Sequence, residues 1–415
     1  MSEVFRWFVG LDWARNQHRA RVLNAEGKSV AECDVGHDGA GLSELCDWLV
    51  EITAAEPAQI AVAIETPRGP VVETLLERGF AVYSINPKQL DRFRDRFTVA
   101  GAKDDSRDAQ VLGDSLRTDR HAFRRLSMDD QLIIELREWL HIEDHLKQDR
   151  TRFSNRLRDQ LWRYYPQANQ LADDAAADWF LDLWEQVPTP AAAARVSETT
   201  VRQILQKHRI RRFDAIAALA ILRQQPLHVA PGTVEAATAH IRGLAAQLRL
   251  VNQQIKQAEQ RLDELCAAIE ASAPGQICGQ HDVAILRSSP GLGRITIAAL
   301  LAEACQPLRQ RDYQVLRMLS GIAPVTRRSG KSLFVRRRYA CNNRLRNALF
   351  HWARAAVQYD AVSKRRYDAL RRRGHNRARA LRGVGDRLLF VLCTMLQRQT
   401  LYDANYKATQ IAMTP

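Results

Sequence analysis

The sequence predicts an α/β domain at the amino terminus followed by a long and mostly helical remainder. Before about residue 125, short apolar runs alternate with turn-forming residues, and beyond about residue 128 apolar residues recur every three or four positions. Positive charge is concentrated in the carboxy-terminal part. At 415 residues the chain exceeds the usual size of one compact core, so we expect two or three domains.

Composition excludes several classes of protein. With 46% hydrophobic and 26% charged residues, the chain is neither wholly disordered nor a disulfide-dense scaffold. No apolar run is long enough to span a bilayer, and Asp12 occurs too early for a signal peptide. The seven cysteines are scattered without a CxxC pair, which favours reduced thiols and argues against a cysteine zinc site. We therefore expect a cytoplasmic protein with no membrane partner.

Residues 1–125 are predicted to begin with strands. The runs WFVGLDWA, HRARVLN and SVAECDV indicate an antiparallel meander, with the turn-forming AEGK between the second and third strands. A helix over 41–52, the strand IAVAIE, a helix over 71–78, the strand AVYSIN and a helix opened by Pro87 are expected to follow. Three antiparallel strands followed by alternating strands and helices are the order of the ribonuclease H-like fold, to which we assign this domain.

Residues 126–277 are predicted to form a helical and coiled-coil region. Apolar residues between Leu136 and Leu161 trace one helical face. Between Ile241 and Ile269 the apolar spacing alternates between three and four, which is an a/d seam over four heptads. Such a seam fits an antiparallel hairpin with the earlier helix or a contact with another chain, and the sequence leaves both interpretations open.

Residues 278–415 carry the excess of positive charge. From Ala323 to Arg387 there are 19 Lys or Arg and three acids, a net charge of +16 against +14 for the whole chain, so the remainder stands at −2. Self-repulsion of this size favours a polyanionic partner. Aromatic residues such as Phe334 and Tyr339 lie among the arginines, which suits nucleic acid better than a membrane surface.

Four carboxylates are candidates for a metal site. Asp12 ends the first expected strand and Glu65 ends the fourth, and these strands are neighbours in a ribonuclease H-like sheet. Asp105 and Asp108, three residues apart, share one face of an expected helix, whereas the macrodipole alone explains Asp104 at its start. Converging carboxylates repel unless a cation neutralises them, and Mg²⁺ or Mn²⁺ prefers oxygen ligands. Such ions serve phosphoryl transfer.

These residues lie in motifs that resemble a known family. GLDWA, AIETPRG and K-x-D-x-x-D-A at 103–109, followed downstream by PGLG and G-I-A-P-x-x-x-x-S-G, resemble the DEDD-type insertion-sequence transposases. This is the insertion-sequence "one-ten" family, related to the Piv and MooV DNA invertases. The resemblance covers roughly residues 7–125 and 280–405. It implies a RuvC-like amino-terminal domain that binds divalent metal through the acids Asp12, Glu65, Asp105 and Asp108, and a carboxy-terminal transposase domain.

The resemblance also implies that Ser329 is a nucleophile. On its own, a serine before glycine indicates only a loop, and Ser320 and Ser332 are neighbouring alternatives. Basic residues around Ser329 would hold a scissile phosphate and stabilise developing charge. They are Arg327, Arg328, Lys331, Arg336, Arg337 and Arg338.

The partners follow from the same resemblance. Family members are understood to be guided by a structured non-coding RNA, the bridge RNA, which pairs with donor and target DNA, and to act as tetramers. We therefore expect donor and target DNA, a structured guide RNA, and a homo-oligomer, dimer or tetramer, in a bacterial, nucleoid-associated setting. The helical stretch over about 165–235 is longer than in the shorter members, and its role stays open.

The segment PGLG, with Gly291 and Gly293, resembles the hairpin of helix-hairpin-helix modules. In those modules, backbone N–H groups at a helix amino terminus bind phosphate without reading sequence. The alternative is a plain turn that opens a helix.

Two other functions compete with the transposase interpretation. A junction-resolving metal nuclease would need the four acids and the basic surface but no serine. A non-catalytic nucleic-acid-binding protein would need only the basic surface, and four acids in positions appropriate to the fold count against it.

Overall fold

The computed structural model describes residues 4–94, 105–271, 280–330 and 332–404. The chain forms two compact units, Met1–Asp129 and Asp130–Pro415. Within the described ranges, no helix is both long enough and apolar enough to cross a membrane. The three-domain division with boundaries after residues 125 and 277 stays a prediction, and each unit is described by itself below.

The first unit is built on a mixed sheet. Its strands are arranged in the order β3-β2-β1-β4-β5-β6. The first three are antiparallel, β4 and β5 run parallel to β1, and β6 is antiparallel to β5. The strands are β1 Trp7–Asp12, β2 Gln17–Leu23, β3 Ser29–Gly36, β4 Ile60–Ile64, β5 Ala81–Ser84 and β6 Arg124–Arg125. The predicted α/β sheet, with its opening meander, is therefore confirmed.

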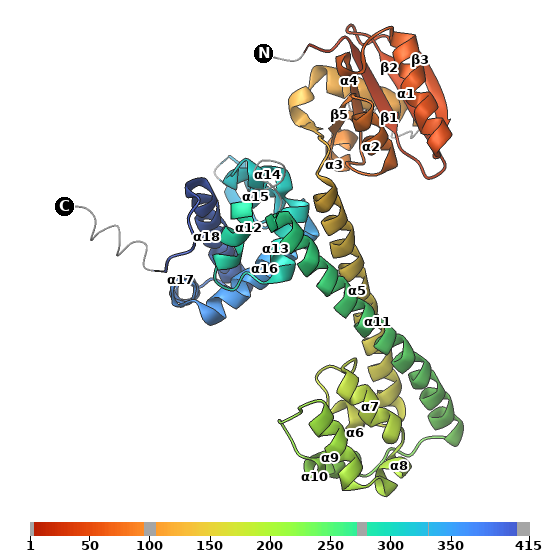
Figure 1. The fold of residues 1–415 in the computed structure, drawn as a ribbon, viewed down its shortest axis with the longest axis vertical. Helices are drawn as coiled ribbons and strands as arrows, with labels where there is room; N and C mark the ends of the chain where they lie inside the picture. The colour runs from red at the N-terminus through yellow and green to blue at the C-terminus, as the bar shows by residue number, and fades with distance from the viewer. Residues whose placement is uncertain (1–3, 95–104, 272–279, 331, 405–415) are drawn as a thin grey trace, which may run out of the picture. The chain divides into compact units, whose positions relative to one another are not determined.

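Strand alternation divides the sheet into two apolar faces. One face, with Val9 and Val62, packs against α1 (Gly39–Thr53) and α2 (Pro70–Glu77). The other face, with Phe8 and Ala63, packs against α3 (Pro87–Arg94) and α4 (Asp105–Thr118). Figure 1 shows α1 and α4 beside the strands of this unit. Because successive side chains of a strand point to opposite faces, every second residue of β1 and of β4 faces α4, counted from Phe8 and Ala61.

Two glycines set how closely α4 lies on the sheet. A Cβ atom added to Gly10 of β1 would lie 1.8 Å from the carbonyl oxygen of Ala109 in α4. One added to Gly113 would lie 3.0 Å from the Gly10 nitrogen and 3.0 Å from a methyl group of Leu23. Glycine in a strand marks such close backbone approaches. The contact holds the first turns of α4 against the end of β1.

The second unit contains a long antiparallel helix pair. The beginning of α5 (Gln131–Tyr164) shares a core with the end of α11 (Pro231–Ala271), and the end of α5 shares another core with the beginning of α11. The nine residues of the predicted seam from Ile241 to Ile269 are all buried. Figure 1 shows the two helices side by side. Of the two interpretations of the seam, the hairpin with the earlier helix is confirmed.

Short helices pack against one end of this pair, around the buried residues Tyr164, Phe180 and Trp184. They are α6 Pro166–Asn169, α7 Asp178–Gln186, α8 Pro190–Arg195, α9 Glu198–Lys207 and α10 Ala215–Leu222. The predicted helical character of the middle region is thereby confirmed.

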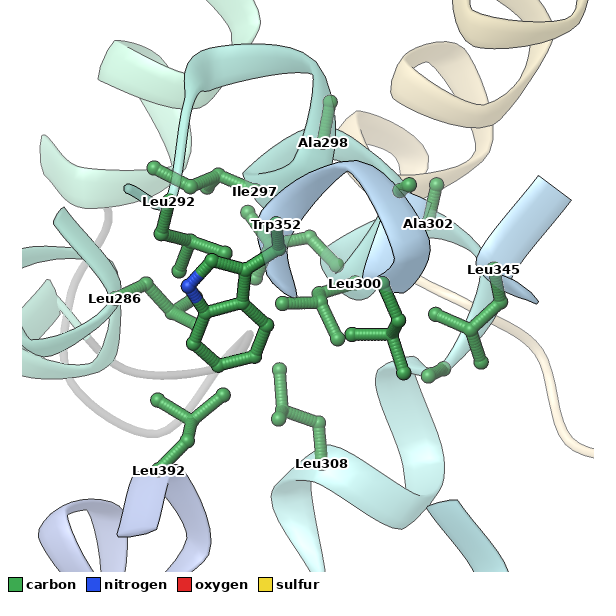
Figure 2. Close-up of a cluster of buried hydrophobic side chains, with 14 of the residues drawn as sticks. Leu286, Leu292, Ile297, Ala298, Leu300, Ala302, Leu308, Leu345, Trp352 and Leu392 are labelled. Carbon is green, nitrogen blue, oxygen red and sulfur yellow. The ribbon is translucent and has the colours of Figure 1, made fainter. Parts of the chain in front are cut away.

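The carboxy-terminal part packs around Trp352. The indole is fully buried, contacts leucines from several helices (Figure 2), and donates a hydrogen bond of 2.9 Å to the carbonyl oxygen of Pro290. Its helices are α12 Gln280–Ser288, α13 Arg294–Glu303, α14 Cys305–Arg309, α15 Tyr313–Leu319, α16 Asn343–Tyr359, α17 Ala361–Arg372 and α18 Arg377–Arg398. A two-stranded hairpin, β7 Val325–Ser329 and β8 Ser332–Arg336, follows α15.

Candidate functional site

Two of the predicted carboxylates lie at one edge of the sheet. Asp12 is the last residue of β1, and Glu65 directly follows the last residue of β4. The parallel register pairs Leu11 with Ile64, so Asp12 and Glu65 occupy the next positions along two adjacent strands. Both also continue the alternation of residues that face α4.

Glu65 and Asp108 meet on one guanidinium. Arg94, the last residue of α3, donates from Nε to Oδ1 of Asp108 over 2.7 Å and from Nη2 to Oδ2 over 2.9 Å. The same Nη2 lies 3.3 Å from Oε1 of Glu65, and Nη1 lies 2.5 Å from Asp91. The Asp108 side chain is only 4% exposed and that of Glu65 is 27% exposed. The structure therefore brings two predicted ligands together on a cation.

The surrounding carboxylates stabilise the charge on Arg94. Partial burial lowers its pKa, but the hydrogen bond and charge of Asp108 and the charges of Glu65 and Asp91 raise the pKa above its ordinary value. Sequence reasoning missed Arg94, because nothing in the basic run DRFRDRF distinguishes it from Arg92. Only the fold shows that it reaches Asp108, fourteen residues away.

The donor chemistry fits a divalent cation. Glu65 and Asp108 already direct carboxylate oxygens at one positive group, and Asp12 is next to Glu65 in register. Asp105 begins α4, one turn before Asp108, but its side chain and the whole of Asp104 lie outside the described residues. Among the described side chains, no three His, Cys, Asp or Glu residues are grouped closely enough to hold a metal ion. The Glu65–Asp108 pair is thus the part of the predicted site that the structure brings together.

Ser329 lies at the tip of the β7–β8 hairpin. It ends β7 and pairs with Ser332 of β8, with Gly330 and Lys331 between them. The side chain of Ser329 and the whole of Lys331 lie outside the described residues. Ser320, one of the alternatives, is fully buried, and its hydroxyl donates to the carbonyl oxygen of Leu316 over 2.7 Å. That hydroxyl is not accessible to a DNA phosphate.

The hairpin is exposed and mixes cations with apolar groups. Arg327 pairs with Phe334 and Arg328 with Leu333 across the two strands. Phe334 is 57% exposed, and the Arg336 guanidinium lies 5.9 Å from its ring centroid. Arg337 and Arg338 follow β8, and Arg338 donates to the carbonyl oxygen of Ala323. Such a surface is suited to contacts with both a phosphate backbone and bases.

The PGLG segment joins α12 to α13. Gly293 is the N-cap of α13, and an added Cβ there would meet nothing within 4 Å. Gly291 has a φ of +71°, and its added Cβ would lie 2.6 Å from the backbone nitrogen of Ala356 in α16. Packing against α16 therefore accounts for Gly291. Phosphate binding by this turn stays a prediction.

The two ends of the chain match family models. Residues 9–166 match the model of the IS110-type DEDD transposases, which is described as "Transposase". Residues 283–368 match a model described as "Transposase IS116/IS110/IS902 family". The first match includes Asp12, Glu65, Asp105 and Asp108, and the second includes Ser329.

Two of three individual relatives match nearly the whole chain. The protein "Mini-circle putative transposase for IS117" of Streptomyces coelicolor is 34% identical over 409 residues, covering 95% of each chain. "Putative transposase y4uE" of Sinorhizobium fredii is 49% identical over 245 residues, which is 55% of this chain and 68% of the relative. The "Insertion element IS110 uncharacterized 43.6 kDa protein" of Streptomyces coelicolor is 27% identical over 417 residues, covering 97% and 96% of the two chains. The chain therefore belongs to the IS110 family of insertion-sequence transposases.

Proposed function

We propose that this transposase cuts and rejoins DNA with two groups of residues. The first is a RuvC-like centre in which Asp12, Glu65, Asp105 and Asp108 hold Mg²⁺ or Mn²⁺. The second is the nucleophile Ser329. The observation that carries the proposal is the meeting of Glu65 and the buried Asp108 on one cation, beside Asp12, at the edge of a sheet of the expected strand order.

The residues of the chain have distinct roles in this proposal. A bound divalent cation supplies positive charge for the developing phosphate oxyanion and favours the deprotonated nucleophile. Asp108 is fixed by burial, and α4 holds it close to β1 through the Gly10 contact. The Oγ–P bond of Ser329 forms as the P–O bond to the leaving strand breaks, and overall the serine proton passes to the leaving oxygen. Because the bond energy is conserved in a phosphodiester, rejoining needs no ATP and no ligase.

Target choice is assigned to RNA in this proposal. The arginines of the hairpin are suited to phosphate contacts, which position a nucleic acid but carry no sequence information. We therefore assign sequence recognition to base pairing by a structured guide RNA bound to a dimer or tetramer of the chain. The two centres meet within one protomer or between protomers. Site-specific recombination by RNA-free protein would contradict the assignment of target choice to a guide RNA.

A recombination assay in cells tests the two chemical centres. Glu65→Gln and Asp105→Asn should abolish recombination, because each removes one ligand charge without creating a cavity. Ser329→Ala should abolish it too. The matched controls are Glu77→Gln, at an exposed site on α2, and Ser332→Ala, opposite Ser329 on the hairpin. Undiminished recombination by the two carboxylate variants would eliminate the metal centre. Full activity of Ser329→Ala would exclude Ser329 as the nucleophile, in favour of a hydrolytic mechanism or of a neighbouring serine such as Ser332.

A further inference from the structure

A small cavity lies at the root of the β7–β8 hairpin. Its volume is about 120 Å³, which is room for several water molecules. Ile322, Leu349 and Leu381 form an apolar part of the wall. Three arginines from three different places in the chain also line it: Arg337 just after β8, Arg346 on α16 and Arg382 on α18.

The walls of the cavity are held in place by backbone hydrogen bonds. The loop between α15 and β7 donates from Ala323 N–H to the Arg317 carbonyl oxygen over 3.0 Å. The segment before α16 donates from Asn342 N–H to the Leu319 carbonyl oxygen over 2.7 Å. The cavity is therefore preformed.

The three arginines of the cavity have no carboxylate partner among the residues that the structure describes. In the described part of the chain, none of Arg337, Arg346 and Arg382 forms an ion pair. Burial, followed by the positive charges of Arg337 and Arg379, lowers the pKa of Arg382 below its ordinary value. Arg346 and Arg382 are half-buried and Arg337 is exposed, so the cavity gathers positive charge that is partly removed from water and has no ion-pair partner among the described residues.

Three half-buried arginines elsewhere in the same helical core are paired with carboxylates. Arg311 lies 2.7 Å from Asp282, Arg317 lies 2.7 Å from Asp386, and Arg344 lies 3.1 Å from Asp144. An uncompensated charge that is partly removed from water is costly, whereas an anion between guanidinium groups relieves that cost. The difference between these arginines and those of the cavity points to an external anion.

We propose that this cavity binds one phosphodiester group of the DNA strand next to the cut, an inference that rests on the proposed function. The guanidinium fork matches two phosphate oxygens, which makes arginine well suited to such a group. DNA is favoured over RNA because the same hairpin carries Ser329, whose target in the proposed function is a DNA phosphate.

The hairpin sets the distance between the cavity and the cut. Ser332, opposite Ser329, is five residues before Arg337. At about 3.4 Å per residue, the strand spans at most about 17 Å. A DNA strand advances about 3.4 Å per nucleotide along the duplex axis. The bound phosphate should therefore lie within about five nucleotides of the scissile one.

Single uncharged phosphates in the DNA test the proposal. Full-length Ser329→Ala protein, with the RNA that co-purifies with it, is titrated with DNA carrying one methylphosphonate at each position in turn. We expect a loss of about tenfold in affinity at one or two positions within about five nucleotides of the cut, the size of a charge-assisted hydrogen bond. Arg382→Ala in this background should bind unmodified DNA about tenfold more weakly and should be insensitive to methylphosphonate at those positions.

Two variants serve as controls. Arg366→Ala removes the same charge from an exposed site on α17 and should keep the sensitivity to methylphosphonate at those positions. Arg382→Lys keeps the charge and should retain part of the affinity, which distinguishes loss of the phosphate contact from misfolding. If Arg382→Ala remains as sensitive as the parent protein at the same positions, the cavity does not bind DNA. Loss of RNA binding with an unchanged DNA profile would also overturn the proposal, by making it an RNA site.

The result of this binding experiment does not depend on whether Ser329 is the nucleophile. Binding is measured with the hydroxyl of Ser329 already removed, so a failed cleavage mechanism leaves the methylphosphonate profile unaffected. Conversely, a flat profile would exclude the cavity and leave the role of Ser329 to its own test.

Discussion

Gly10→Ala should displace the helix that carries Asp108. The new Cβ would lie 1.8 Å from the Ala109 carbonyl oxygen, whereas ordinary contacts begin at 3.4 Å. The strand and α4 must therefore separate by about 1.6 Å, or distort to the same extent. Overpacking costs about 1–3 kcal/mol, and the upper end applies here because the contacted atom belongs to the backbone and cannot rotate away. Replacing glycine by alanine in a strand recovers only about 0.5–1 kcal/mol, so we expect a net local destabilisation of about 2 kcal/mol.

Hydrogen exchange of the full chain measures this effect locally. A loss of about 2 kcal/mol corresponds to roughly 30-fold faster exchange of the α4 and β1 amides that open together. DNA cleavage should fall by about 100-fold or more, because misplacing a catalytic group by about 1 Å has that effect. Gly39→Ala, in α1 of the same unit with nothing within 4 Å of its added Cβ, is the matched control and should exchange like wild type. Wild-type exchange of α4 in Gly10→Ala would refute the close-packing argument.

Three further predictions concern single side chains. Arg94→Gln should strengthen Mn²⁺ binding by about tenfold in calorimetric titration, because the variant removes the positive charge that competes with the metal for Glu65 and Asp108. Unchanged or weaker binding would contradict this prediction. Burial, followed by the charge of His37, lowers the pKa of His18 in the folded protein. The contribution of His18 to stability is therefore present above about pH 6.5, the pKa of an unperturbed histidine, and is lost as the pH falls toward the pKa of the folded state. The loss is at most about 1.4 kcal/mol per pH unit. The free energy of unfolding in urea should be lower at pH 5.5 than at pH 7.5. An equal decrease in His18→Gln would show that His18 is not its cause. Phe334→Ala should weaken the binding of single-stranded DNA by about tenfold, as expected when one base loses its stacking partner. Tyr359→Ala, at a site that is 75% exposed, is the control and should not weaken it. Equal effects of the two variants would argue against a stacking role of Phe334.

The amino-terminal fold was predictable because its signals are local. Short apolar runs, the AEGK turn and the amphipathic helices each follow from neighbouring residues, whereas the short edge strand β6 was not predicted. Gly10 was not predictable as a packing residue, because its requirement comes from the backbone of α4, about a hundred residues later. Arg94 was missed because its carboxylate partners Glu65 and Asp108 belong to other elements, and only the fold brings them together.

The carboxy-terminal part shows a different limit. Sequence reasoning placed Ser329 in a loop, whereas the structure places it at the end of β7. The segment VTRRSGKSLFVR lacks alternation between apolar and polar residues because both faces of the hairpin are exposed, so burial leaves no pattern to read. The heptad seam, by contrast, could be predicted as a buried face from its apolar spacing, but only the fold could show that α5 covers it.

The central claim is that a serine forms the covalent link to DNA, and one measurement tests it directly. Protein trapped on a nicked DNA substrate is digested with nuclease and protease, and the nucleotide-bearing peptide is sequenced by mass spectrometry. The account predicts a nucleotide on Ser329 in wild type and no adduct in Ser329→Ala that still binds DNA. Cleaved DNA ends without any adduct, or an adduct on Ser332, would contradict it.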